Sequence, residues 1–198
     1  MSSPDRIMVL RFCRDRSRNQ LATVASLVHG VPTTGLRFFN VYGPRQDPSS
    51  PYSGVISIFI DRILDGRELT IYGDGEQTRD FVYVGDVVNF LMSAMQRSGN
   101  MPSVYNVCTG ESVSINQLAK IIMFLTGRRV DITKLPSRKG DIRISVGSPG
   151  HAARMLDVSA GYNLASGLKL LLASCGEESA VDEPSLEAVA SKLRMAME

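Results

Sequence analysis

The order of apolar and polar positions along this chain of 198 residues predicts short strands that alternate with helices. Apolar residues recur at helical spacing in several segments, each closed by a glycine or a polar turn. These segments predict helices over residues 19–28, 55–64, 87–95 and 114–125. Short runs of β-branched and aromatic residues predict strands at 35–42, 69–72, 81–84, 104–107 and 130–132. Such alternation is typical of an α/β fold.

One polar residue has a predicted local role at a helix end. Asp86 directly precedes the helix expected over residues 87–95. We expect its carboxylate to accept hydrogen bonds from the amides of the first turn, which have no partner within the helix.

The composition excludes several classes of protein. Hydrophobic residues make up 43% of the chain and charged residues 21%, which excludes a largely disordered, collagen-like or coiled-coil chain. No apolar run approaches the ~20 residues of a membrane-spanning helix, and the short run at residues 7–10 is a poor signal peptide. Cys13, Cys108 and Cys175 are far apart and favour neither a disulfide nor a zinc site. We therefore expect a cytoplasmic protein without a metal.

Charge is balanced overall and uneven at the two ends. The net charge is +2, but residues 1–18 hold five arginines against two aspartates, and residues 173–198 hold six acids against two bases. We interpret the basic arm and the acidic tail as solvated ends that flank a central part, residues 19–172. A nucleic-acid binder that uses the basic arm is an alternative, but the net charge of the whole chain is close to zero and no aromatic residues are interleaved with the arginines in a pattern that would stack on bases. We expect neither nucleic acid nor a membrane as a partner.

Two segments could hold an anion. The loop at residues 72–80 has two glycines and ends in Arg79 and Asp80, and an arginine side chain can bind a phosphate through two parallel hydrogen bonds. The segment at residues 138–143 places Arg138, Lys139 and Arg143 around a glycine and Asp141. Spacing alone leaves the alternative open that both are exposed loops.

A third segment imitates a dinucleotide-binding turn. Residues 147–153 fit the pattern GxxGxxA between a predicted strand and a predicted helix. Pro149 lies inside this turn, and no strand that ends in an acid follows at the expected distance of ~20 residues. We interpret this pattern as fortuitous.

Taken together, several motifs resemble one family over residues 35–141, and more weakly to residue 172. They comprise Gly35-Leu36-Arg37-Phe38-Phe39-Asn40-Val41-Tyr42-Gly43-Pro44-Arg45-Gln46-Asp47-Pro48, Leu69-Thr70-Ile71-Tyr72-Gly73-Asp74-Gly75, Thr78-Arg79-Asp80-Phe81-Val82-Tyr83-Val84 and Tyr105-Asn106-Val107. The chain resembles the C-terminal half of the NAD-dependent epimerase/dehydratase family, which are extended short-chain dehydrogenases, and above all its UDP-glucose 4-epimerases. The resemblance implies a Rossmann-like α/β fold with a small substrate-binding subdomain.

The resemblance also implies roles for residues that would bind a UDP-sugar. Asn40 matches an asparagine that contacts the sugar diphosphate, and Tyr72 matches a residue beside the uracil. Arg79 and Arg138 match two arginines that clamp the diphosphate. Asp141 matches a carboxylate that reaches the ribose.

On the cofactor side, the resemblance places Phe39 and Val41 near the nicotinamide end of an NAD site. The family's N-terminal GxxGxxG loop has no counterpart here, and no tyrosine of this chain has a lysine four residues later. That Tyr-x-x-x-Lys pair supplies the general acid–base of the family's chemistry. We therefore assign no catalytic residue, and we expect the chain alone not to bind NAD.

Two interpretations remain open. In the first, the chain is a nucleotide-sugar epimerase or dehydratase by descent, truncated and inactive by itself. In the second, it is a non-catalytic module that binds a UDP-sugar weakly or contacts another protein. The helix over residues 19–28 would allow a homodimer of the family's kind, and the sequence does not identify the sugar.

Overall fold

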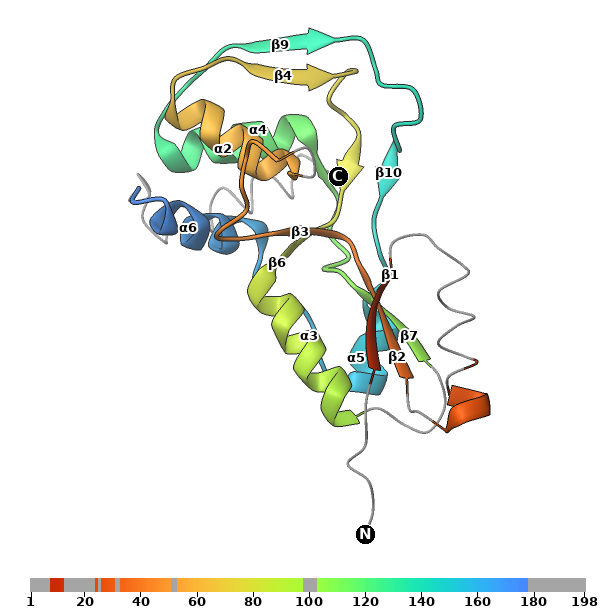
Figure 1. Ribbon diagram of the computed structural model, residues 1–198. Helices are drawn as coiled ribbons and strands as arrows, with labels where there is room; N and C mark the ends of the chain where they lie inside the picture. The colour runs from red at the N-terminus through yellow and green to blue at the C-terminus, as the bar shows by residue number, and fades with distance from the viewer. Residues whose placement is uncertain are drawn as a thin grey trace. The chain divides into compact units, whose positions relative to one another are not determined.

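A computed structural model describes residues 8–12, 24, 26–30, 33–50, 53–97 and 103–177. Helices and short strands alternate along these residues (Figure 1), so the predicted α/β class is confirmed. The chain divides into two compact units. The first unit comprises residues 1–41, 80–111 and 146–161, and the second comprises residues 42–79, 112–145 and 162–198. None of the described helices is both long and apolar enough to cross a membrane.

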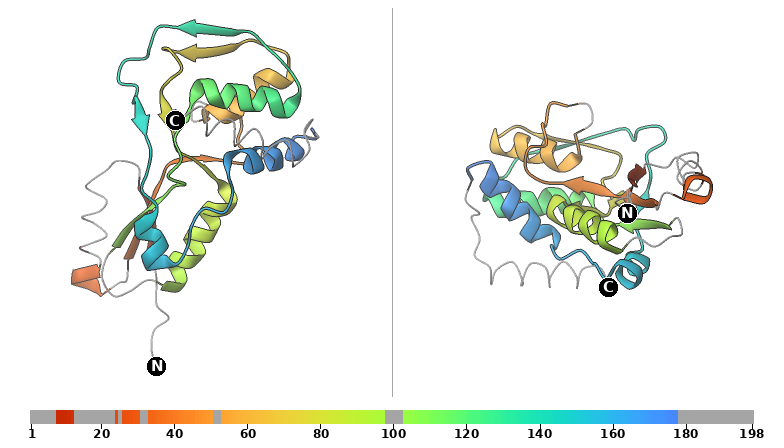
Figure 2. Two further views of the ribbon diagram at one scale, coloured as in Figure 1. Left: turned by 180° about the vertical axis from the view of Figure 1, so that it is seen from behind. Right: turned by 60° about the horizontal axis from the view of Figure 1, so that its bottom comes forward.

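A parallel sheet forms the centre of the first unit. Its strands are β1 (Met8–Phe12), β2 (Thr33–Phe38) and β7 (Ser103–Val107), in the order β1-β2-β7. Two helices, α3 (Val84–Arg97) and α5 (Gly150–Leu156), contact this sheet and each other (Figures 1 and 2). They bury a common apolar core, which includes Leu36, Val82, Val87, Phe90, Tyr105, Val107 and Leu156.

A second, two-stranded sheet joins β3 to β6. It consists of β3 (Asn40–Tyr42), whose first two residues belong to the first unit, and β6 (Phe81–Tyr83). Phe39 interrupts the predicted strand over residues 35–42, so that strand is observed as β2 followed by β3.

Among the described residues, the second unit contains two small sheets and three helices. In one sheet β4 (Leu69–Tyr72) runs parallel to β9 (Ile132–Leu135). In the other, β5 (Thr78–Arg79) pairs with β10 (Ile144–Ser145) on one side and with β8 (Val113–Ser114) on the other. The helices are α2 (Val55–Leu64), α4 (Ile115–Thr126) and α6 (Leu164–Ser174); α4 contacts both of the others. Figure 2 shows α2 and α4 beside the β4–β9 pair.

Local signals in the sequence fix the ends of α4. Ser114 and Gln117 form a capping box, in which each side chain accepts a hydrogen bond from the other residue's main-chain amide. Gly127 ends the helix in the left-handed conformation, at a φ of 65°. Both ends agree with the prediction, as do the bounds of α2.

The predicted capping role of Asp86 is wrong. Helix α3 begins at Val84, so Asp86 lies within the first turn and not before it. Its buried carboxylate accepts a hydrogen bond of 2.8 Å from the main-chain amide of Gly161, a contact far away in sequence.

Three other segments differ from their prediction or lie partly outside the described residues. β9 begins two residues later than the strand predicted at 130–132, because its pairing with β4 starts at Ile132 opposite Leu69. Residues 8–12, predicted as part of a solvated arm, instead pair with β2 as β1. The helix predicted over 19–28 lies mostly outside the described residues, although 24 and 26–29 are helical. Residues 178–198 of the acidic tail also lie outside them.

Candidate functional site

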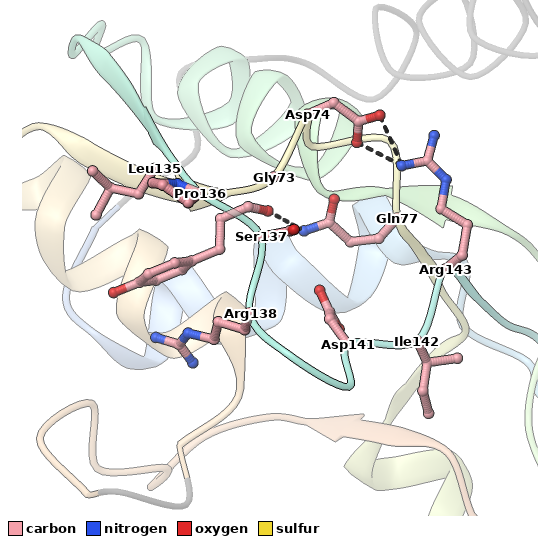
Figure 3. Close-up of a pocket in the computed structure, with 11 residues that line it drawn as sticks. Gly73, Asp74, Gln77, Leu135, Pro136, Ser137, Arg138, Asp141, Ile142 and Arg143 are labelled. Atoms are coloured by element: carbon pink, nitrogen blue, oxygen red, sulfur yellow. Dashed lines mark hydrogen bonds and ion pairs between the residues drawn. The ribbon is translucent and has the colours of Figure 1, made fainter.

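The second unit contains a cavity of about 480 Å³, a volume typical of small-molecule sites. Its walls come from the turn after β4 and from the segment between β9 and β10 (Figure 3). Because β4 and β9 are parallel, their carboxyl ends lie at the same edge of the sheet and their following loops are neighbours. The lining residues are Tyr72, Gly73, Asp74, Gln77, Leu135, Pro136, Ser137, Arg138, Asp141, Ile142 and Arg143.

Tyr72 and Arg138 meet in this cavity. Tyr72 pairs with Leu135 at the ends of the two strands, which brings the chain three residues later back toward the tyrosine. The Arg138 guanidinium carbon lies 3.8 Å from the centre of the Tyr72 ring, a cation–π contact. The Tyr72 carbonyl accepts a hydrogen bond of 2.8 Å from Nε2 of Gln77, which fixes the turn between them.

Arg79 and Asp141 also come together. The Arg79 side chain is 18% exposed, and its Nη2 donates a hydrogen bond of 2.5 Å to Oδ1 of Asp141. Its Nη1 donates to the main-chain oxygens of Thr78 and Ile142, at 2.8 and 2.6 Å. Asp141 and Ile142 line the cavity, whereas Arg79 itself is not among the lining residues.

Asp74 and Arg143, two residues that line the cavity, form an exposed ion pair. Nη1 of Arg143 donates to both carboxylate oxygens of Asp74, at 2.6 and 2.8 Å (Figure 3). These hydrogen bonds lower the pKa of Asp74 and raise that of Arg143. Each residue belongs to one of the two segments that the sequence analysis identifies as anion-binding candidates, but their pairing with each other was not predicted.

The remaining predicted site residues belong to the first unit. The main-chain amide and Nδ2 of Asn40 both donate to the carbonyl of Asp80, at 3.0 and 3.1 Å. Val41 packs against the apolar core of this unit. The Phe39 ring lies so close to Gly147 that a Cβ there would be 2.7 Å from Cζ. The structure therefore gathers Tyr72, Arg79, Arg138 and Asp141 in the second unit, while Asn40, Phe39 and Val41 lie in the first.

Sequence reasoning missed Asp80, a carboxylate with 0% exposure. It accepts hydrogen bonds from the amide and hydroxyl of Thr109, both at 2.8 Å, and from the amides of Gly110 and Gly147, at 2.9 and 3.1 Å. Burial, assisted by the negative charge of Asp80, raises the pKa of the Cys108 thiol to about 12. No nearby signal in the sequence identifies these partners, since they follow Asp80 by 29 to 67 residues.

Close packing explains why the turn at residues 147–153 begins with a glycine, Gly147. A Cβ on Gly147 would lie 2.5 Å from Sγ of Cys108, so no larger residue fits. The helix after the turn, α5, has seven residues. Nor do three His, Cys, Asp or Glu side chains gather as a metal site anywhere in the described part of the chain.

A three-stranded parallel sheet with helices packed on it, together with small separate sheets, agrees with the fold of an extended short-chain dehydrogenase.

Comparison with known proteins finds the same family. Residues 16–108 match the model of the NAD dependent epimerase/dehydratase family. The resemblance found in the sequence is therefore confirmed.

Individual relatives agree with this assignment. A UDP-glucose 4-epimerase of Mycolicibacterium smegmatis is 42% identical over 54% of this chain and 33% of its own length. A UDP-N-acetyl-alpha-D-glucosaminuronate decarboxylase of Bacillus cytotoxicus is 40% identical over 57% of this chain and 34% of its own length. The crystal structure of the Thermotoga maritima UDP-glucose 4-epimerase with UDP-glucose superposes with a TM-score of 0.77 at 39% identity, over 81% of this chain and 51% of that one.

The chain spans about a third of the length of these curated relatives and about half of that solved structure. The relatives include both UDP-sugar epimerases and decarboxylases, so the shared feature is a nucleotide-sugar substrate and not one reaction.

Proposed function

We propose that this chain recognises the uridine diphosphate part of a nucleotide sugar through the cavity of its second unit, and that the 198-residue polypeptide alone performs no epimerase chemistry. The observation that carries the proposal is the stack of Arg138 on Tyr72 at one wall of the cavity, with Arg79 held behind Asp141 at another. An aromatic ring can stack on a nucleotide base, and guanidinium groups can donate charge-assisted hydrogen bonds to phosphates.

Binding by this cavity alone should be weak. It lies at the surface, so that water and salt screen the arginines and the loops lose entropy on binding. We expect a Kd near millimolar for UDP or UDP-glucose, which corresponds to ~4 kcal/mol.

We infer that the described residues alone do not hold NAD, the cofactor that the family name implies. Val41 is partly buried and packs against the apolar core, and Phe39 and Cys108 lie against Gly147, where a pyrophosphate bound to this turn would need to approach the main chain. The chain also has no Tyr-x-x-x-Lys pair to move a proton. Conversion of a UDP-sugar is therefore a property of the family that we do not assign to this polypeptide by itself.

A titration followed by NMR tests the binding. Adding UDP at low salt should shift the amide signals of residues 72–77 and 135–143 in the wild type. Arg138→Ala should weaken the affinity about tenfold, because it removes both a phosphate donor and the stacking partner of Tyr72. Arg67→Ala is a matched control, because Arg67 is an exposed arginine of the same unit that pairs with Asp61 outside the cavity. If UDP shifts no signal around the cavity, or if Arg138→Ala binds like the control, the proposal is wrong.

A further inference from the structure

Asp141 stands between Arg79 and the cavity. The Asp141 side chain is 31% exposed and lines the cavity, whereas Arg79 is 18% exposed and does not. The two are joined by a hydrogen bond of 2.5 Å between Nη2 and Oδ1. A ligand in the cavity therefore meets the carboxylate before it can meet the guanidinium.

Arg79 is held in place by more than this pair. Its Nη1 donates to the carbonyls of Thr78 and Ile142, so the guanidinium does not need Asp141 to keep its position. Removing the carboxylate charge would leave an anchored arginine whose Nη2 has only a weaker, uncharged acceptor at residue 141 and can donate more readily to an anion in the cavity. Arg138, by contrast, already lines the cavity, stacked on the ring of Tyr72.

We propose that Asp141 competes with the ligand for Arg79, so that only a ligand with enough negative charge to displace the carboxylate gains the hydrogen bond from Arg79. This inference rests on the proposed binding of a UDP moiety to the cavity. A diphosphate can displace the carboxylate from Nη2, because it offers stronger, multiply charged acceptors. An uncharged nucleoside gains nothing from Arg79 and is indifferent to the pair.

This role has the opposite sign to the one that the resemblance implies. If Asp141 held the ribose, its loss would weaken every ligand that carries a ribose, charged or not. If it competes for Arg79, its loss strengthens the binding of ligands that carry a diphosphate, including inorganic pyrophosphate, which has no ribose.

The experiment compares wild type, Asp141→Asn and the double variant Arg79→Gln/Asp141→Asn by NMR titration with inorganic pyrophosphate, UDP and uridine at low salt. For Asp141→Asn we expect pyrophosphate and UDP to bind about fivefold more tightly, in the range that a partly exposed ion pair is worth, with uridine unchanged. The gain should disappear in the double variant. Asp61→Asn is the control, because it removes the same charge from another arginine pair of this unit, outside the cavity.

The results separate this inference from the proposed function. If the wild type binds UDP and Asp141→Asn binds it no better, the inference is wrong and the proposed function stands. A parallel loss of UDP and uridine in Asp141→Asn would assign the carboxylate to the ribose instead. An equal gain in Asp61→Asn would trace the effect to net charge and overturn the inference. If neither protein binds any anion, both proposals fall. Asp141→Ser, compared in the same way, replaces Asp141→Asn if the amide variant does not give a folded spectrum.

Discussion

Asp80 is a fully buried carboxylate whose burial is compensated by hydrogen bonds from Thr109, Gly110 and Gly147. These donors come from two segments, one that follows β7 and one that precedes α5, so a single side chain ties both to the start of β6. Its carbonyl also receives both donors of Asn40. Buried polar groups are tolerated only when they are paired in this way.

We predict that Asp80→Asn destabilises the protein by about 2–4 kcal/mol. The amide of asparagine can keep two of the four hydrogen bonds through its oxygen, but its NH₂ group then faces main-chain amides, and each buried donor left unpaired costs ~1–3 kcal/mol. Urea unfolding followed by circular dichroism measures the difference. Asp61→Asn, a change of the same chemistry at an exposed site, should stay within ~0.5 kcal/mol of wild type. A similar stability for the two variants would show that the four hydrogen bonds contribute little.

The helix ends and turns show which parts of the fold are encoded locally. The bounds of α2 and both ends of α4 were predictable because a polar turn or a glycine lies within a few residues of each. The start of α3 was not predictable, because Asp86 accepts a hydrogen bond from Gly161, 75 residues away in the sequence.

The same distinction between local and distant contacts holds for the cavity. Each arginine was a candidate by itself, but the stack of Arg138 on Tyr72 depends on the pairing of β4 with β9.

Gly75 links the cavity turn to helix α4. Its φ is +79°, and a Cβ there would lie 2.1 Å from Oδ1 of Asn116, in the first turn of α4. Nδ2 of Asn116 donates to the carbonyl of Asp74 at 2.9 Å, which holds the turn against the helix. The turn that carries Asp74 and Gln77 is therefore positioned by a helix as well as by its own strand.

We predict that Gly75→Ala destabilises the protein by about 2–3 kcal/mol, of which ~1 kcal/mol reflects the left-handed conformation and the rest the collision with Asn116. Gly66→Ala isolates the first contribution, because Gly66 has a φ of +67° and nothing within 4 Å of its Cβ position. Thermal unfolding of both variants measures the difference. Equal losses would mean that Asn116 moves aside freely and that α4 does not position the turn.

Over residues 35–141 the motifs of one family occur in order, whereas a Tyr-x-x-x-Lys pair for that family's chemistry is absent from the chain. Four residues to which the resemblance assigns contacts with a nucleotide sugar, namely Tyr72, Arg79, Arg138 and Asp141, form two contacting pairs in the second unit. On the cofactor side, the two residues that the resemblance names lie against the core and against Gly147. Sequence order revealed the family because its motifs are local. The ion pair of Arg79 with Asp141 could not be predicted, because it joins strand β5 to a segment 62 residues away in the sequence.

The last prediction concerns the 198-residue polypeptide as a catalyst. We expect no saturable binding of NADH and no interconversion of UDP-glucose and UDP-galactose when NAD is added. A positioned general acid–base is worth ~10²–10⁴ in rate, and no Tyr-x-x-x-Lys pair is present to supply it. NADH fluorescence measures cofactor binding, and a coupled assay for UDP-glucose measures turnover. The Thermotoga maritima epimerase is the active control. Arg138→Ala separates turnover by this chain from turnover by a contaminating host enzyme.

Turnover that survives purification and falls in Arg138→Ala would show that the chain is itself catalytic. Micromolar NADH binding would show that the described residues hold a dinucleotide after all, and the turn at residues 147–153 would then be the first place to look for it.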